Sequence, residues 1–210
     1  MTRRLVFLVW GIALLAACTE PMTPSRTDFY AFDDAGAVFH WPTERLPVRI
    51  WADPRSYMRA LMQTAISTWE DEFLYGEFRG VLVTDSSHAD VIALFSGSVP
   101  TNAPADTGPP VLACSGSTTN AAVVFADSSD KVLYIDLRVL GTFSDGEIAA
   151  CMRRVAIHEV GHALGILTHS SDPDDIMNAT VTASSPSRRD ENTMQILYHT
   201  PPTVVPPPRP

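Results

Sequence analysis

The chain has 210 residues and a mass of 22.9 kDa, which is enough for one domain with a sizeable core but too little for two large ones. Hydrophobic residues make up 45% of the chain and charged residues 19%, which excludes a wholly disordered protein. Acidic residues outnumber basic ones by 24 to 15, for a formal net charge of −9. This balance argues against a nucleic-acid partner and against attraction to anionic lipid through charge.

The first 17 residues have the pattern of an export signal. Arg3 and Arg4 supply a positive start, residues 5–14 are almost all apolar, and Leu-Ala-Ala precedes Cys18. These residues resemble the signal peptides of bacterial lipoproteins, which implies cleavage before Cys18 and attachment of lipid to it. Thr19 is not an aspartate. The resemblance therefore implies an exported protein that its lipid anchors to the cell envelope, at the outer membrane or the cell surface.

Export leaves Cys114 and Cys151 as a pair in an oxidising compartment. We expect a disulfide between them, because exported proteins seldom keep free cysteines. The alternative is two separate buried thiols.

Composition divides the rest of the chain into three parts. Residues 18–44 are rich in Thr, Pro, Asp and Ala with little periodicity, which predicts a tether. Residues 45–199 carry the alternating and helical patterns of one folded domain. Residues 200–210 contain six prolines and are predicted to form an exposed, extended tail.

Regular patterns begin at residue 47. Residues 47–51 alternate like a strand, and Asp53 followed by Pro54 predicts the start of a helix. Apolar residues at helical spacing then predict a buried stripe. The stripe consists of Met58, Leu61, Met62, Ala65, Ile66, Trp69 and Phe73. Further β-rich runs predict strands at residues 81–83, 89–95, 121–125 and 131–137.

Two more helices are predicted in the second half of the chain. Ser144 and Glu147 form a capping box that opens a helix running to about Leu164. A last short helix lies between Pro186 and Pro201. This order of elements predicts a mixed sheet covered by helices. The loop at residues 96–119 is long for a compact domain, which favours a functional role for it.

The run His158-Glu159-Val160-Gly161-His162 carries the chemistry. Residues four apart on a helix project from one face, so the two imidazoles can bind one Zn²⁺. Glu159 flanks them and can act as general base on a water. The alternative is a helix with two ordinary surface histidines, but a glycine in mid-helix costs about 1 kcal/mol and needs a reason.

The segment after this helix strengthens the zinc interpretation. Gly165 can end the helix in a left-handed conformation, and the resulting turn would bring His169 to the metal as third ligand. Ser170, Pro173 and Met177 follow. With these residues the sequence resembles the matrixins, a family of metzincin metalloproteases. The resemblance extends over residues 45–199 and is most specific over residues 157–177.

The resemblance implies an α+β, metzincin-like catalytic domain with a twisted mixed sheet of about five strands and three helices. It also implies a zinc-dependent endopeptidase that hydrolyses proteins or peptides, with one catalytic zinc held by His158, His162 and His169. Glu159 is then the general base for the attacking water. Met177 forms a hydrophobic floor beneath the histidines.

The sequence departs from the matrixin pattern in two places. His169 comes one residue later than the family's third histidine, so the extra residue has to be absorbed as a bulge in the turn. No cysteine-bearing pro-segment precedes the domain, because Cys18 is assigned to the lipid. The enzyme is therefore expected to be active as exported.

Three alternatives remain open at this point. Asp172, Asp174 and Asp175 can bind calcium, or form only a solvated acidic turn. Glu191 is the one candidate for a third ligand of the gluzincin type. The chain can also be a catalytically inactive or non-enzymatic zinc-binding surface lipoprotein, although the intact Glu159 argues against this.

The run at residues 119–125 is predicted to be the sheet edge that faces the cleft. Its position before one more strand and the zinc helix resembles that of the matrixin edge strand. An unpaired edge can take an extended peptide as an added strand. Val123, Val124 and Phe125 are therefore the predicted substrate-binding residues.

Overall fold

The structure is a computed structural model that describes residues 28–55, 57–98, 113–126, 132–140 and 143–209. The predicted signal peptide, the lipidation site Cys18 and the first part of the predicted tether lie outside these residues. In the described part of the chain, no helix has the length and apolar character needed to cross a membrane.

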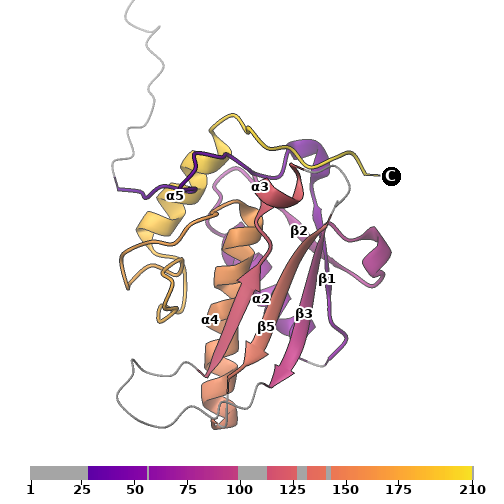
Figure 1. Cartoon of the computed structure of the whole chain (residues 1–210), viewed down its shortest axis with the longest axis vertical. Helices are drawn as coiled ribbons and strands as arrows, with labels where there is room; N and C mark the ends of the chain where they lie inside the picture. Colours follow the sequence, from indigo (N-terminus) through magenta and orange to yellow (C-terminus); the bar gives the residue numbers. More distant parts are fainter. Residues whose placement is uncertain (1–27, 56, 99–112, 127–131, 141–142, 210) are drawn as a thin grey trace, which may run out of the picture.

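A five-stranded sheet forms the centre of the domain (Figure 1). Its strands are β1 (Val48–Ala52), β2 (Gly80–Val83), β3 (Val91–Ser98), β4 (Cys114–Thr118) and β5 (Leu133–Val139), in the order β2-β1-β3-β5-β4. Four strands run parallel, and β4 pairs antiparallel with β5 at one edge. This mixed sheet confirms the predicted α+β fold.

The helices lie mainly on one face of the sheet, as Figure 1 shows. The α-helices are α2 (Met58–Glu70), α3 (Ala121–Val124), α4 (Asp145–Leu164) and α5 (Arg188–Tyr198), and the 3₁₀ turns are η1 (Thr43–Arg45) and η2 (Ser86–His88). Every second residue of β1 is buried, since alternate side chains face the helices. On α2, the indole of Trp69 donates to the carbonyl of Ile157 on α4 at 2.8 Å, which locks the two helices together.

Helix α4 is built as the sequence predicts. The Ser144 hydroxyl accepts from the Glu147 amide, and the Glu147 carboxylate accepts from the Ser144 amide, so both halves of the capping box are present. The helix ends at Gly165, whose φ of 122° is a conformation that favours glycine. Its central turns are buried, which places the metal-binding motif between the sheet and the loops beyond Gly165.

The prediction of a strand at residues 121–125 is wrong, because residues 121–124 form α3. The Asn120 side chain accepts from the Ala122 amide at 2.8 Å and caps the short helix, and this cap overrides the β preference of the two valines. The edge strand is instead β4, inside the segment predicted to be a loop. Its small and polar residues have little β preference of their own, and pairing with β5 defines the strand.

The predicted start of the first long helix is also wrong. The Asp53 amide donates to the Ala93 carbonyl and prolongs the pairing of β1 with β3. The Asp53 carboxylate accepts from the Arg55 amide at 3.0 Å, which closes a turn instead of capping a helix. Helix α2 therefore begins at Met58.

The tether and the tail are shorter than predicted. Phe39 and Trp41, which fall in the predicted tether, are fully buried in the core. The predicted tail runs beside them, where Val204 forms a parallel bridge with Phe39 and the Thr203 amide donates to the Val38 carbonyl at 2.9 Å. Both terminal segments cover apolar surface, so the folded unit extends past the predicted limits of residues 45 and 199 at each end.

The predicted disulfide joins Cys114 to Cys151, with 5.9 Å between their Cα atoms. It ties the first residue of β4 to the second turn of α4 and so connects the edge strand to the helix that bears the histidines.

Replacing both Cys114 and Cys151 by alanine is expected to lower the free energy of unfolding. A bridge that closes a loop of this length restricts the unfolded chain by about 4 kcal/mol. Urea titration of the two proteins measures the difference, and the native protein in reductant should lose a similar amount. Equal stability of the native and substituted proteins would contradict this expectation.

Candidate metal centre

Three histidines converge at the end of α4. His158 and His162 are four residues apart on the helix, and His169 comes from the segment that follows Gly165. One ring nitrogen from each lies within 4.8 Å of the others. His162 Nε2 is 3.0 Å from His158 Nε2 and 3.3 Å from His169 Nε2.

The extra residue before His169 is accommodated by the N-terminal segment. The Leu167 amide donates to the Phe32 carbonyl at 2.6 Å, and the Thr168 hydroxyl donates to the Asp34 carboxylate at 3.1 Å. The bulge is therefore held on its outer side, and the third histidine still reaches the other two.

Main-chain carbonyls fix the tautomers of two rings. His158 Nδ1 lies 2.7 Å from the Ile176 carbonyl and His162 Nδ1 lies 2.5 Å from the Ile166 carbonyl. A carbonyl oxygen can only accept, so both Nδ1 atoms carry the proton and both Nε2 atoms present a lone pair. Burial lowers the pKa of His158 to about 4 and that of His162 to about 3, which keeps both rings neutral at pH 7.

The facing nitrogens suit a metal ion. Two lone pairs at 3.0 Å cannot hydrogen-bond to each other, and a cation between them removes their repulsion. Zinc bound tetrahedrally at 2.0–2.1 Å from each nitrogen sets neighbouring nitrogens about 3.3 Å apart. The spacing of His162 from His158 and His169 matches this value closely. The donor set therefore fits zinc.

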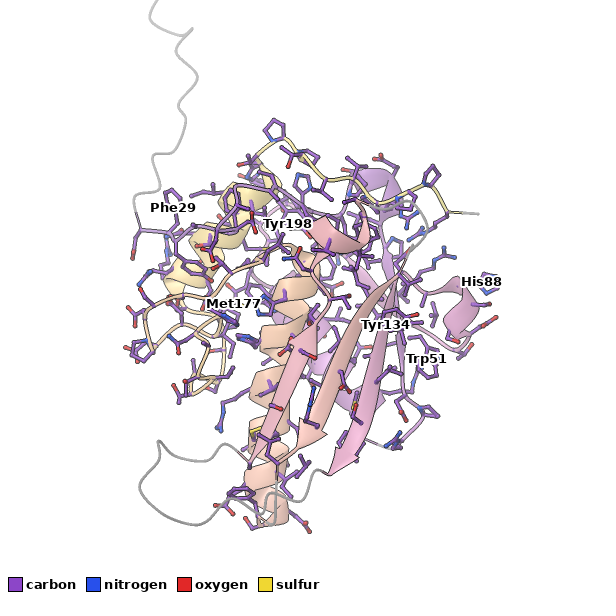
Figure 2. The ribbon with its side chains drawn as sticks, viewed as in Figure 1. Phe29, Trp51, His88, Tyr134, Met177 and Tyr198 are labelled. Carbon is purple, nitrogen blue, oxygen red and sulfur yellow. A yellow bond between two sulfur atoms is a disulfide. The ribbon has the colours of Figure 1, made fainter. Side chains whose placement is uncertain are left out.

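Met177 packs against the middle of α4, between His158 and His162 in the sequence, and explains the glycine there. Its side chain is fully buried beside Gly161, where an added Cβ would collide with the Met177 sulfur and come within 2.8 Å of Trp69. Figure 2 shows Met177 beside the upper part of α4. A side chain at position 161 would displace Met177 and Trp69 from the helix that carries His158 and His162.

Asp190, at the start of α5, holds the main chain of Ile176 and Met177. It is completely buried, and its Oδ2 accepts from the Ile176 amide at 2.7 Å. Its Oδ1 accepts from the Tyr30 hydroxyl at 2.6 Å. Ile176, whose carbonyl orients His158, is thus held by Asp190 of α5, and Tyr30 of the N-terminal segment holds Asp190 in turn.

Glu159 lies beside the three histidines and is 4% exposed. Its Oε2 accepts from the Thr118 hydroxyl at 2.7 Å, and its Oε1 occupies the space that a side chain at Gly116 would fill. Burial raises the pKa of Glu159 to about 7, with a further rise from the Asp136 charge and an opposing effect of the Thr118 hydrogen bond. A carboxyl group with this pKa can exchange protons near neutral pH.

A cavity of about 270 Å³ opens over these groups. It is lined by Gly116, Ser117, Thr118, Thr119, Asn120, Glu159, His162, Leu167 and His169. The metal-binding face of α4 and the free side of β4 therefore share one cavity.

The predicted substrate-binding residues do not line this cavity. Val123 is 72% exposed on α3, and Phe125 packs against Phe39 and Trp41 in the core. Val123 and Val124 belong to α3 and Phe125 directly follows it, so these residues offer no sheet edge to a peptide.

Gly116 and Thr118 were not identified from the sequence as residues of the site, although the spacing of Cys114 and Cys151 contains a signal for Thr118. From Cys151 to Glu159 a helix rises about 12 Å, and from Cys114 to Thr118 a strand rises about 13 Å. A disulfide between the two cysteines therefore places Thr118 next to Glu159.

The acidic turn and Glu191 have other partners. Arg189 lies 3.0 Å from Asp172 and 3.7 Å from Asp175, and Ser170 and Ser187 also donate to Asp175. Glu191 accepts from Gln195 at 2.9 Å. Among the described residues, the group that can hold a metal consists of the three histidines, so Glu191 is not a ligand.

The mixed sheet, the three histidines and the methionine buried against their helix define a metallopeptidase domain. A family model described as matrixin matches residues 41–199, and the chain belongs to this family. No curated protein gives a significant match to the chain.

Proposed function

We propose that the protein is a zinc-dependent endopeptidase with Glu159 as its general base. The observation that carries the proposal is the convergence of three imidazole nitrogens, two of them facing lone pairs, beside a buried carboxyl group in one cavity. Membership of the matrixin family supports it.

Each residue of the site has a defined part in hydrolysis. Zinc, when held by the three imidazoles, supplies Lewis acidity to water and to the peptide carbonyl. Glu159 accepts the proton of the attacking water on a carboxylate oxygen and returns it to the leaving amine. The Thr118 hydroxyl holds Oε2 of Glu159, so the carboxyl group stays oriented toward the cavity.

We place the substrate along β4. This strand pairs with β5 on one side, and its other side borders the cavity. An extended peptide can form main-chain hydrogen bonds with such an edge and pass over the histidines. Gly116 and Thr118 replace residues 123–125 in this role.

The activity is tested by chelation. The purified protein should contain about one zinc per chain and cleave casein or an unstructured peptide internally. A chelator should remove both the zinc and the cleavage, and added zinc should restore both. Bound zinc without any cleavage would instead favour a non-enzymatic zinc-binding protein.

Replacing Thr118 by valine is expected to reduce kcat about tenfold with little change in KM, since a hydrogen bond to a carboxylate is worth about 1.5 kcal/mol or more. Valine keeps the shape of threonine and removes the donor. Thr118→Ser keeps the donor and should retain most of the activity. Equal kinetics for the valine and serine variants would show that the hydroxyl has no such part.

We also propose that Cys18 carries the lipid anchor, on the strength of the pattern in residues 1–18. Mass spectrometry of the membrane-bound protein should find an acylated Cys18 as the first residue. A Cys18→Ser variant should lose the modification. A native protein that keeps residues 1–17 would overturn the assignment.

A further inference from the structure

A second polar cluster lies away from the metal centre, where three arginines surround one buried aspartate. Asp90 is 2% exposed and directly precedes β3. Its carboxylate is 2.9 Å from Arg45, 3.8 Å from Arg49 and 2.5 Å from Arg209. Arg45 ends η1, Arg49 lies four residues later on β1, and Arg209 comes from the C-terminal segment, so two distant parts of the sequence meet at Asp90.

The acceptor positions of Asp90 are filled. Oδ1 accepts from Arg45 Nη2 and Arg209 Nε, and Oδ2 accepts from the Arg49 main-chain amide and Arg209 Nη2. A carboxylate offers about four such positions. One negative charge therefore faces three guanidinium groups, and two positive charges stay unbalanced.

Arg49 differs from the other two arginines. Arg45 also donates to the Pro207 carbonyl, and Arg209 also donates to the carbonyls of Arg45 and Pro47. The Arg49 guanidinium forms no hydrogen bond with any residue of the described ranges, because its buried Nε atom lies 3.8 Å from Asp90 Oδ2, which is an ion-pair distance but too long for a hydrogen bond. Its side chain is 28% exposed, so its remaining donors are accessible from solvent.

A cavity of about 180 Å³ lies over this cluster. It is lined by Arg45, Arg49, Ser87, His88, Ala89, Asp90, Val132, Pro208 and Arg209. The nearby carboxylate of Asp85 is paired with His88 at 3.0 Å. Figure 2 shows His88 on the opposite side of the molecule from Met177, and this cavity shares no lining residue with the cavity at the metal centre.

The positive charge at this cavity is local. Burial lowers the pKa of Arg45; Asp90 opposes this effect, and the charges of Arg209 and Arg49 add to it. The whole chain carries a formal net charge of −9, so it does not attract anions from a distance. An anion that binds here has to be recognised by direct contact.

We propose that this cavity binds a phosphate oxyanion, with the Arg49 guanidinium as its main ligand. A planar guanidinium binds phosphate through two parallel hydrogen bonds. A phosphate dianion neutralises the two unbalanced charges, whereas a carboxylate neutralises one. Free phosphate and a phosphate monoester present the same chemistry to Arg49.

The test is a titration of the full-length protein at pH 8 with sodium phosphate, followed by calorimetry and by the melting temperature. Sodium chloride and sodium acetate at matched ionic strength are the controls for salt and for a carboxylate. Phosphate is expected to bind and raise the melting temperature more than either control. Glycerol 3-phosphate in place of phosphate distinguishes the two sources, and the tighter ligand of the pair identifies which one the cavity prefers.

Arg49→Gln is the informative variant, because its main-chain amide can still bind Asp90 and the carboxylate keeps its other partners. We expect this variant to weaken the binding of phosphate at least tenfold. Arg188→Gln removes an equal charge from an exposed side chain on α5 and should change the binding less than twofold. The proposal is overturned if phosphate acts no more strongly than acetate, or if the two variants respond alike. Peptide hydrolysis enters neither readout, and the comparison of Arg49→Gln with Arg188→Gln separates binding at this cavity from binding of phosphate to zinc.

Discussion

Replacing Glu159 by glutamine is expected to abolish peptide hydrolysis while zinc stays bound. Glutamine has nearly the same shape but cannot take the proton of the attacking water. Loss of a general base lowers the rate by a factor on the order of 10² to 10⁴. The imidazole ligands are unchanged, so the zinc content should remain near that of the native protein. Measuring kcat/KM and bound zinc on the same samples separates the two effects.

Two comparison variants sharpen this test. Glu44→Gln changes an exposed glutamate on η1 and should leave both quantities unchanged. His169→Ala removes a ligand and should lower both zinc content and activity. If Glu159→Gln kept a tenth or more of the native rate, the general-base assignment would be wrong.

Gly165→Ala is expected to cause the largest loss of stability of any single substitution considered. The φ of this residue is 122°, which L-residues adopt at a cost, and an added Cβ would collide with the Phe39 carbonyl oxygen. The Phe39 carbonyl belongs to the main chain of a buried residue, so it cannot move aside as a flexible side chain would. We expect the free energy of unfolding to fall by about 3 kcal/mol or more.

Gly146→Ala is the matched control on the same helix. A Cβ at this position meets no atom within 4 Å, and alanine favours the helix by about 1 kcal/mol over glycine. The control should therefore unfold at an equal or higher urea concentration than the native protein, and Gly165→Ala at a much lower one. Similar midpoints for the two variants would show that the turn after α4 tolerates a side chain.

The metal centre was predictable because its information is local. His158 and His162 are related by helical spacing alone, and the position of Gly165 places a turn directly after them. The reason for Gly161 could not be read from the sequence. The sequence shows that a glycine in the middle of a helix lowers helix stability, but it does not show what the glycine makes room for. The benefit is the space for Met177, which comes from another part of the chain.

The edge of the sheet was mispredicted because β preference is a weak guide when a cap competes with it. Val123 and Val124 favour a strand by composition, but a single hydrogen bond from the Ala122 amide to the Asn120 side chain starts a helix there. Gly116 has the opposite character. A glycine on a strand suits a close approach of another group, and here that group is Glu159.

The ends of the folded unit were mispredicted for a different reason. Proline-rich and polar segments look unstructured in sequence, because they lack periodicity. The Val204 amide donates to the Val38 carbonyl, and Val204 forms a bridge with Phe39. Nothing in the sequence of either segment indicates that the two lie side by side. Such pairing is visible only once the surfaces that it covers are known.

The hydrogen bond from Tyr30 to Asp190 connects the N-terminal segment mechanically to the three-histidine site. Asp190 holds the Ile176 amide, and the Ile176 carbonyl holds His158. Tension on the chain ahead of residue 28 would reach this line of three bonds through Tyr30. Stretching the protein from its N-terminus while recording zinc release would show whether the line yields before the sheet does. A force on the N-terminal segment therefore acts on the residues that orient His158. The C-terminal segment is bonded to the same N-terminal segment through the Val38 carbonyl.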